Sequence, residues 1–294
     1  MKILITGSNG LLGQKIILQL LKSQTDFLAT SLGENRNPKC PDSNYASLDV
    51  SDKDMVNAVF NDYKPDYIIH TAAITNVDYC EEHIDECRKI NVEGSNILFR
   101  ACQQNKAHFL LLSTDFVFDG KKGNYSETDV PNPLSVYAQS KHDAEQILRQ
   151  SEYPSWSIVR TIIVFGEGIN LSRSNIVLWA KEALSSGKPL TIIDDQFRSP
   201  TWADDLAWAC LRICELKKKG IYHISGPERM SIFDLVLRIA KYHNLDTSSL
   251  HKTDSKSLNQ PAKRPPCTGF DLSKARKDLG YRPKTLEESL RLLS

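Results

Sequence analysis

Two kinds of apolar pattern alternate along the first half of the chain. Runs rich in apolar and β-branched residues predict strands at Lys2–Thr6, Phe27–Ser31, Tyr45–Leu48, Asp66–His70, His108–Ser113 and Ser157–Thr161. Apolar residues spaced three and four apart predict the helices between them, at Leu11–Leu21, Asp52–Tyr63, Ile84–Gln104 and Val136–Gln150. Strict alternation of strand and helix indicates an α/β fold with a doubly wound parallel sheet, covered by helices on both faces.

After Phe165 the pattern changes and helices dominate. They are predicted at Ser174–Ser186, Asp204–Leu216, Ser231–His243, Ser273–Leu279 and Leu286–Leu292, with one short strand near Ile221–Ser225 and a proline-rich loop at Gln260–Pro266. We therefore expect a first lobe of residues 1–165, with returning segments near 201–225. A smaller, mostly helical lobe of residues 166–294 should cap the carboxyl ends of the strands.

Composition and charge exclude several classes of partner. The 294 residues include 37 Lys and Arg against 36 Asp and Glu, so no global positive field attracts nucleic acid or an anionic membrane. No apolar run is long enough to span a bilayer, and residues 1–5 lead directly into a strand pattern rather than a signal peptide. We expect a cytoplasmic protein without a membrane or nucleic-acid partner.

The seven cysteines are odd in number and form no CxxC pair, which favours reduced thiols in the cytosol. The acidic segment from Cys80 to Cys87 also contains His83, so a metal site is one interpretation. A solvated acidic helix start explains the same residues. We favour the helix start and expect no metal.

A glycine-rich segment, Thr6–Gly13, lies between the first predicted strand and the first helix. Glycines at this junction permit a tight turn, a close approach to a pyrophosphate, and packing of the helix on the strand. The helix start also presents free N–H groups and a partial positive charge to phosphates. The segment therefore predicts a dinucleotide-binding Rossmann domain, whose contacts would come from Gly7, Asn9, Gly10, Leu11, Leu12 and Gly13.

The GxxGxxG spacing of these glycines resembles that of the extended short-chain dehydrogenase/reductase superfamily. The resemblance implies that Asp49 and Val50 contact adenine, and that Ala72 and Ala73 lie beneath the nicotinamide ribose. It also matches Asn91 to a position that is usually asparagine.

The choice between NADP and NAD depends on the residues after the second predicted strand. That strand ends at Ser31 without an acid to bind the ribose 2′-hydroxyl, and Arg36 follows a few residues later. An arginine there can accept the 2′-phosphate of NADP, so we favour NADPH. Glu34 lies nearby and leaves NAD open.

Tyr137 and Lys141 form a YxxxK motif that places both side chains on one face of a predicted helix. The superfamily resemblance also places Thr114, after the fifth strand, beside them. A ketone that accepts hydride develops negative charge on oxygen and needs a proton donor. Tyr137 would supply the proton, Lys141 would support it electrostatically, and Thr114 would hydrogen-bond the substrate oxygen.

Longer segments narrow the resemblance to the dTDP-4-dehydrorhamnose reductase family. Ser113–Gly120 is similar to the signature STDYVFDG, with Phe116 in place of tyrosine. Further matches are Ala72–Asp78, Tyr125–Asp129, Asp195–Thr201, Arg264–Pro265 and Asp271–Lys274, so the likeness covers nearly the whole chain. It implies NADPH-dependent reduction of the 4-keto group of dTDP-6-deoxy-L-lyxo-4-hexulose to give dTDP-L-rhamnose.

The expected substrate residues are Thr75, Asn76, Val77, Asp115, Asn175 and Arg198. Arg198 replaces a glycine that is usual in the family, and Ile163 stands where tryptophan is common. The segment Leu171–Asn175 is longer and more basic than usual. Arg198 could grip a diphosphate bidentately, and the alternative is a plain surface charge.

Two other functions stay open. Tyr222–Gly226 and Pro261–Pro265 also resemble the regulatory beta subunit of methionine adenosyltransferase, which implies a nucleotide-sensing binding partner without necessary turnover. An epimerase or dehydratase of the same superfamily would bind NAD tightly and consume no cofactor. A homodimer is compatible with all three.

Overall fold

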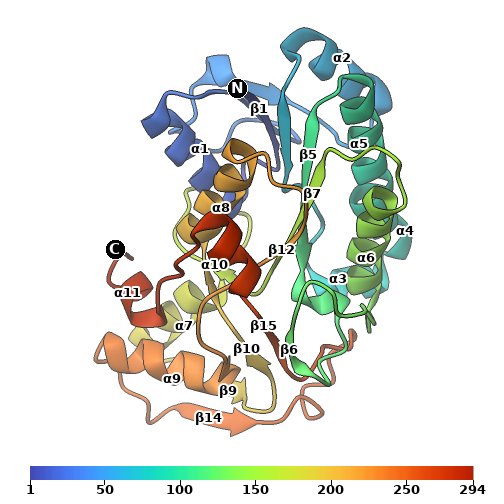
Figure 1. The fold of residues 1–294 in the computed structure, drawn as a ribbon. Coiled ribbons are helices and arrows are strands. Elements are labelled where there is room, and N and C mark those ends of the chain that lie inside the picture. The colour runs from blue at the N-terminus through green and yellow to red at the C-terminus, as the bar shows by residue number, and fades with distance from the viewer. Residues whose placement is uncertain (294) are drawn as a thin grey trace.

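The protein is built around a single sheet of seven parallel strands, seen edge-on in Figure 1. The computed structural model describes residues 1–293. The strand order is β12-β7-β5-β4-β1-β2-β3. The bounds are β1 Lys2–Thr6, β2 Asp26–Ser31, β3 Tyr45–Ser47, β4 Tyr67–His70, β5 His108–Thr114, β7 Trp156–Thr161 and β12 Gly220–Ile224.

Helices cover both faces of this sheet because its strands are apolar on both sides. In β1, Ile3 and Ile5 pack with α1, α8 and α10, whereas Leu4 packs with α2, α5 and α6 on the other face (Figure 1). These helices are α1 Leu11–Ser23, α2 Lys53–Tyr63, α5 Ser95–Gln104, α6 Val136–Arg149, α8 Ala203–Glu215 and α10 Ser273–Leu279. The predicted α/β class and doubly wound parallel sheet are confirmed.

The seven predicted strands of the sheet end within one residue of their predicted bounds. The predicted helix at Ile84–Gln104 is wrong as a single α-helix. It consists of α4 (Ile84–Arg88), a π-helical turn (Lys89–Gly94) and α5, and it is preceded by a short helix, α3 (Val77–Glu82). The wider turn places Asn91 inward, and its amide bonds the backbone of Ile74.

Beyond the main sheet, the structure contains more strands than the sequence pattern predicts. Parallel pairs form between β8 and β11, β9 and β14, and β6 and β15, and an antiparallel pair forms between β10 and β13. Their bounds are β6 Gly123–Tyr125, β8 Val164–Phe165, β9 Leu190–Ile193, β10 Phe197–Arg198, β11 Thr201–Trp202, β13 Met230–Ser231, β14 Leu250–Thr253 and β15 Thr268–Phe270. Three helices, α7 Ile176–Ser185, α9 Ile232–Tyr242 and α11 Leu286–Leu290, share a second apolar core with β8, β9, β11 and β13. Tyr125 of β6 and Phe270 of β15 belong instead to the core of the main sheet.

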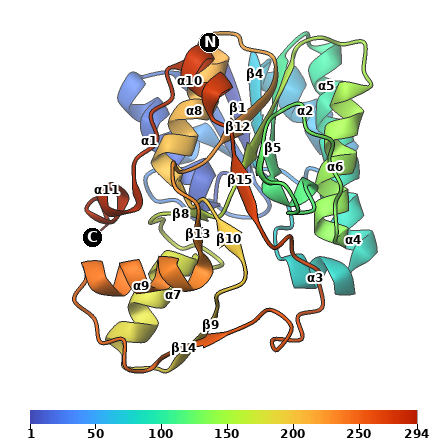
Figure 2. The ribbon, with the colours of Figure 1, turned by 60° about the horizontal axis from the view of Figure 1, so that its bottom comes forward.

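A long connection, residues 254–267, runs from β14 to β15 and passes close to α3 (Figure 2). We call it the strap. Asp78 of α3 accepts hydrogen bonds from the Arg264 guanidinium at 2.6 Å and from the Ala262 amide at 3.2 Å. The strap therefore joins the second half of the chain to the first, across one edge of the sheet's carboxyl end.

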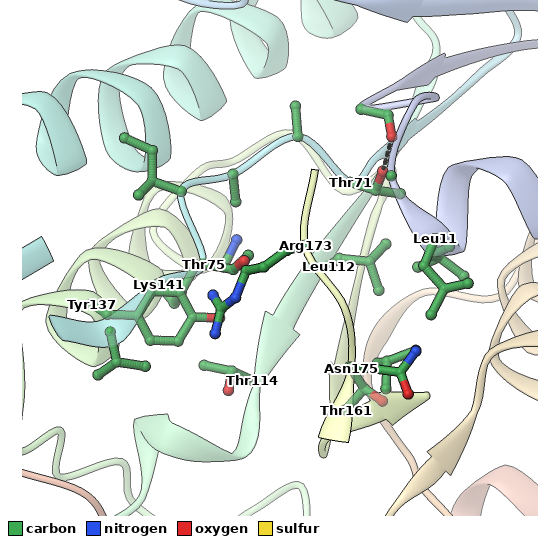
Figure 3. Close-up of a pocket in the computed structure, with 18 of the residues that line it drawn as sticks. Leu11, Thr71, Thr75, Leu112, Thr114, Tyr137, Lys141, Thr161, Arg173 and Asn175 are labelled. Atoms are coloured by element: carbon green, nitrogen blue, oxygen red, sulfur yellow. Dashed lines mark hydrogen bonds between the residues drawn. The ribbon is translucent and has the colours of Figure 1, made fainter. Parts of the chain in front are cut away.

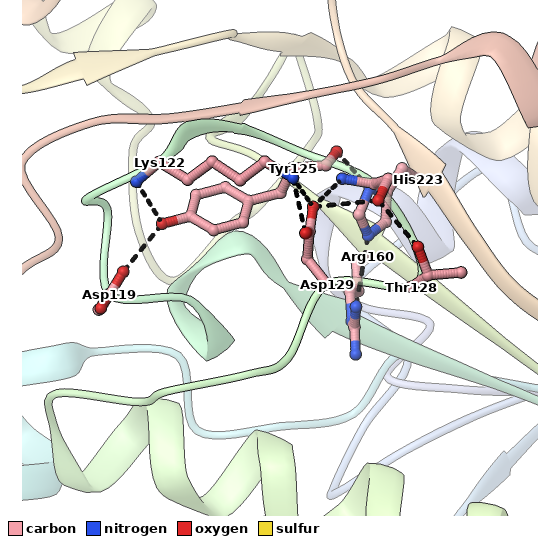
Figure 4. A network of polar contacts seen from close by, with 8 residues as sticks. Asp119, Lys122, Tyr125, Thr128, Asp129, Arg160 and His223 are labelled. Carbon is pink, nitrogen blue, oxygen red and sulfur yellow. Dashed lines mark hydrogen bonds and ion pairs between the residues drawn. The ribbon is translucent and has the colours of Figure 1, made fainter.

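A buried polar network fastens α6 and the loop after β5 to the sheet. The Arg160 and Glu145 side chains are fully buried and form a bidentate ion pair, with N···O distances of 2.8 and 2.5 Å. Arg160 also donates to His223 of β12, whose Nδ1 lies 3.1 Å from the Tyr125 carbonyl oxygen (Figure 4). Burial and the Arg160 charge lower the pKa of His223 to about 3, so the ring is neutral and its Nδ1 proton faces Tyr125.

Candidate active site

A cavity of about 940 Å³ opens where the carboxyl ends of the strands meet the second half of the chain (Figure 3). Most of the predicted site residues line it: Gly7, Gly10, Leu11, Leu12, Ser31, Arg36, Asp49, Val50, Ala72, Ala73, Thr75, Val77, Thr114, Asp115, Tyr137, Lys141, Asn175 and Arg198. Asn9, Gly13 and Asn76 do not. Ligands of open α/β sheets bind at this edge.

The glycine loop packs closely against the segment after β4 and against α1, and leaves the start of α1 uncapped. Gly7 has a φ of +72°, and a Cβ there would lie 2.6 Å from the Ala72 amide nitrogen. A Cβ on Gly13 would lie 2.6 Å from the Gly7 carbonyl oxygen, so Gly13 lets α1 pack on the loop without facing the cavity. No side chain caps the start of α1 at Gly10, which leaves its N–H groups available to an anion.

Asn9 orders the segment after β2 from outside the cavity. Its side-chain nitrogen donates to the Glu34 carbonyl oxygen at 2.8 Å, and its side-chain oxygen accepts the Arg36 amide at 2.9 Å. This clamp holds Arg36 at the cavity wall with an exposed side chain, while Glu34 lies outside the wall. A cation therefore lies near the end of β2, where Ser31 stands in place of the acid that would favour NAD.

Asp49 and Val50 lie at the same end of the cavity, after β3. Asp49 Oδ1 accepts the Ser51 amide at 2.8 Å and the Ser51 hydroxyl at 2.7 Å. These bonds hold the pKa of Asp49 below its usual value, so the carboxylate is charged. Both bonds are made to Oδ1.

Tyr137 and Lys141 lie one turn apart near the start of α6, with their side chains on the cavity floor (Figure 3). Ser135 caps this helix by accepting the Ala138 amide, and Glu81 accepts the Val136 amide at 2.8 Å. Burial raises the pKa of Tyr137, and the hydroxyl of Thr114 opposes that shift. Tyr137 is therefore protonated at neutral pH and able to give a proton.

Burial lowers the pKa of Lys141 to about 8, because the Glu145 carboxylate offsets only part of the desolvation. His70 lies on the sheet side of Lys141, between the Thr6 hydroxyl at 2.6 Å and the Ser95 hydroxyl at 3.0 Å. Burial and the Lys141 charge lower the pKa of His70 to about 3. Lys141 thus has a neutral imidazole as neighbour and is the cation of the cavity floor.

Thr114 is the last residue of β5, and its hydroxyl accepts the Phe116 amide at 3.2 Å. The same hydroxyl lies 3.2 Å from Asp115 Oδ1. Asp115 is buried at the cavity wall and forms an ion pair with Arg198, with Nε and Oδ2 3.7 Å apart. Arg198 is therefore buried, and the alternative interpretation as a surface charge is wrong.

The remaining predicted substrate residues lie around the mouth of the cavity. Thr75 and Val77 line it, whereas Asn76 caps α3 by accepting the Tyr79 amide at 3.4 Å. Asn175 lines the cavity from the other side, where its Nδ2 donates to the Gly166 carbonyl oxygen at 2.7 Å. Asn76 thus shapes the wall without facing the cavity.

Several lining residues were not among the predicted site residues. Arg173 extends into the cavity toward Tyr137 (Figure 3), and its basic loop was the one signal in the sequence. Gln260 and Arg264 of the strap also line the cavity. Ile163 does so with a φ of +32°, a rare conformation for a β-branched residue.

The described residues contain neither a metal-binding cluster nor a membrane-spanning helix. Across residues 1–293, no three His, Cys, Asp or Glu side chains gather in a way that could hold a metal ion. Within the same residues, no helix combines the length and apolar character needed to cross a bilayer. All seven cysteines are free thiols.

Comparison with known proteins gives consistent matches along the whole chain. The family model described as RmlD substrate binding domain matches residues 1–293. A dTDP-4-dehydrorhamnose reductase from Aggregatibacter actinomycetemcomitans is 31% identical, covering 99% of this chain and 97% of its own. The methionine adenosyltransferase 2 subunit beta from Bos taurus is 30% identical, covering 93% and 81%. Among solved structures, dTDP-4-dehydrorhamnose reductase from Bacillus anthracis in complex with NADP has a TM-score of 0.86 at 26% identity, covering 99% and 98%.

Proposed function

The chain belongs to the RmlD substrate binding domain family, and from this membership we propose that it reduces the 4-keto group of dTDP-4-dehydrorhamnose with NADPH to give dTDP-L-rhamnose. The protein is an NAD(P)H-dependent oxidoreductase of the sugar-nucleotide reductase kind. The nucleotide and sugar are part of the proposal.

The observation that carries the proposal is a buried Tyr137–Lys141 pair beside Thr114, on the floor of a cavity whose far end is the glycine loop. Bound NADPH would supply the hydride. The glycine loop and the start of α1 would hold its pyrophosphate, and Arg36 its 2′-phosphate. The residues present fit this group, because Gly10, Leu11 and Leu12 line the cavity at a helix start that no side chain caps.

This chain's own residues would handle the proton. When a ketone oxygen gains negative charge, the protonated Tyr137 would donate its phenolic proton to that oxygen. Lys141, one helical turn from Tyr137 on the cavity floor, would stabilise the tyrosinate that results. Thr114 would turn its one hydroxyl proton from Asp115 to the same oxygen and fix its position. Thr75, Val77 and Asn175 would contact the sugar nucleotide.

The test is NADPH oxidation by the purified protein with enzymatically generated dTDP-4-keto-6-deoxy-L-hexose, compared with the Tyr137→Phe variant. We expect the variant to lose at least about 100-fold in kcat, because the proton donor is gone, and to bind NADPH within about twofold of the wild type. A variant that keeps most of its activity contradicts the mechanism. Tyr79→Phe, on the exposed face of α3, is the matched control.

The similarity to methionine adenosyltransferase 2 subunit beta supports a second candidate, a regulatory subunit that binds NADP without turnover. Assays of the wild-type protein distinguish the reductase from the regulatory subunit. NADPH binding without oxidation, across a panel of keto-sugar nucleotides, together with formation of a stoichiometric complex with a methionine adenosyltransferase catalytic subunit, would favour the regulatory function.

A further inference from the structure

The Arg198 guanidinium is directed entirely at the protein. Its Nη1 donates to the carbonyl oxygens of Phe197 at 2.8 Å and Pro266 at 3.3 Å. Its Nη2 donates to the Pro265 carbonyl oxygen at 2.5 Å and faces Gln196 Oε1 at 3.4 Å. Its Nε faces Asp115 Oδ2 at 3.7 Å. Since arginine has five N–H groups, none is left over for a diphosphate.

The two prolines explain why a guanidinium is needed there. Pro265 and Pro266 end the strap and carry no backbone N–H, so this stretch cannot form an ordinary strand ladder. Their carbonyl groups still need donors, because an unpaired buried carbonyl is costly. Arg198 supplies donors to both, and the Phe197 amide adds one to Pro266 at 2.8 Å. Together they tie the end of the strap to β10.

Asp115 connects the other side of the guanidinium to the catalytic strand. Its side chain is 3% exposed and that of Arg198 is 2% exposed, so neither charge is compensated by solvent. Asp115 Oδ2 also accepts the hydroxyl of Thr268, the first residue of β15. Asp115 Oδ1 accepts the Thr114 hydroxyl. One carboxylate therefore joins Arg198, β15 and Thr114.

We propose that Arg198 is a positioning residue for the reduction: its pairing with Asp115 orients the Thr114 hydroxyl, and the same guanidinium fastens the strap over the cavity. The first part rests on the proposed function, and the second does not. Gln260 and Arg264 of the strap line the cavity, so fastening the strap sets two of the substrate walls while Thr114 is aligned beside Tyr137.

The first arm of the test measures amide hydrogen exchange in the Arg198→Ala variant. We expect exchange to quicken by about tenfold or more in both the strap and residues 113–118, because both lose a buried partner. The control is Arg238→Ala, which removes ion pairs at 2.6 and 2.5 Å to Glu228 and Glu287, distant in the fold from β5. Unchanged exchange in either segment overturns the proposal.

The second arm measures turnover and its rescue. We expect Arg198→Ala to lower kcat/KM for the keto-sugar nucleotide by roughly 100-fold, as a displacement of about 1 Å near the chemistry does. NADPH affinity should stay within about twofold of wild type, because the glycine loop is untouched. Millimolar guanidinium should raise kcat/KM of Arg198→Ala by at least about tenfold and leave kcat/KM of Arg238→Ala unchanged. Absence of rescue, or an equal loss in the control, overturns the positioning role.

The pH profile supplies a readout that a general loss of stability would not move. Burial raises the pKa of Asp115, and the Arg198 charge opposes the shift. The other ionisable groups around this pair are Tyr137 of α6 and, on the strap side, Arg264 and Cys267. Without Arg198, Asp115 should protonate at higher pH, so the acid limb of kcat/KM should move to higher pH. If the acid limb of kcat/KM stays at the same pH in Arg198→Ala, Arg198 does not orient Thr114 through Asp115.

Arg198→Lys covers the case in which the alanine variant does not fold. Lysine keeps the charge but cannot reach Asp115 and both proline carbonyls together, so we expect faster strap exchange and a smaller pH shift. If the wild-type protein oxidises no NADPH with any keto-sugar nucleotide, the proposed function fails. The exchange experiment then still decides whether Arg198 fastens the strap.

Discussion

At the scale of single residues, Lys141 carries a stability cost that its chemistry explains. Because its folded pKa is about 8 against an ordinary value of 10.5, holding it charged in the fold costs up to about 3 kcal/mol at pH 7. Because the folded pKa lies below the unfolded one, the fold carries the full free-energy penalty at pH values below 8. The penalty disappears as the pH rises from 8 toward 10.5, where the unfolded chain also loses the proton.

We therefore predict that Lys141→Met unfolds at higher denaturant concentration than the wild type at pH 7 while losing turnover. The gain in free energy of unfolding should be about 2 to 3 kcal/mol at pH 7 and shrink toward zero near pH 10. Urea titrations at several pH values measure it. Lys89→Met, at an exposed position, is the control and should change little. A Lys141→Met variant no more stable than wild type at pH 7 contradicts the buried-charge argument.

The residues of the site were predictable where a local motif carried the chemistry, and not where the chain folds back on itself. Tyr137 and Lys141 are one turn apart in one helix, so their proximity follows from the sequence. Arg264 comes to the cavity through its ion pair with Asp78, 186 residues away, and no local pattern encodes that contact. The roles of the site residues stay predictions until variants are measured.

At the scale of elements, the π-helical turn at Lys89–Gly94 depends on Asn91. Its side-chain oxygen accepts the Ile74 amide at 2.8 Å, and its Nδ2 donates to the Ile74 carbonyl oxygen and the Ser140 hydroxyl, both at 3.0 Å. The turn therefore ties the segment after β4 to α6, the helix of Tyr137 and Lys141.

We predict that Asn91→Ala lowers the free energy of unfolding by about 2 to 3 kcal/mol, since it leaves buried backbone groups unpaired. Hydrogen exchange at the Ile74 amide should quicken in the same variant. Thermal and urea unfolding measure the first effect and mass spectrometry the second. Asn96→Ala, two residues past the turn in α5, is the control. Full protection of Ile74 in Asn91→Ala would contradict this function of the turn.

Helices and long strands were predicted well because many residues repeat one pattern, whereas the short pairs were not. β8, β10, β11 and β13 contain two residues each, too few for any period to show. The π-helical turn was missed for a related reason. One extra residue per turn hardly changes the apolar spacing of Ile84–Gln104, although it breaks the α-helix.

At the scale of the whole molecule, α8 comes from the second half of the chain but covers the sheet of the first half. Leu206, Cys210 and Ile213 of α8 belong to the same apolar cluster as Ile3 and Ile16, and β12 pairs with β7. The segments α8 and β12 therefore lie against the sheet of the first half. The division of the chain at residue 165 stays a prediction, and it can be tested directly.

We predict that a fragment of residues 1–165 does not unfold cooperatively, because the face covered by α8 would be exposed to water. A fragment of residues 1–225 should show more native near-ultraviolet circular dichroism and bind less of a hydrophobic dye. The full chain is the reference for both measurements. Cooperative unfolding of the fragment of residues 1–165 would mean that the first half is independent of α8.

The position of α8 in the chain also has a consequence for biosynthesis. The sheet strands up to β7 leave the ribosome before α8, and the intervening 50 or so residues take on the order of several seconds to translate. During that interval the nascent chain presents an uncovered apolar face around Ile3 and Ile16. We expect chaperones to bind that apolar face until α8 docks against α1.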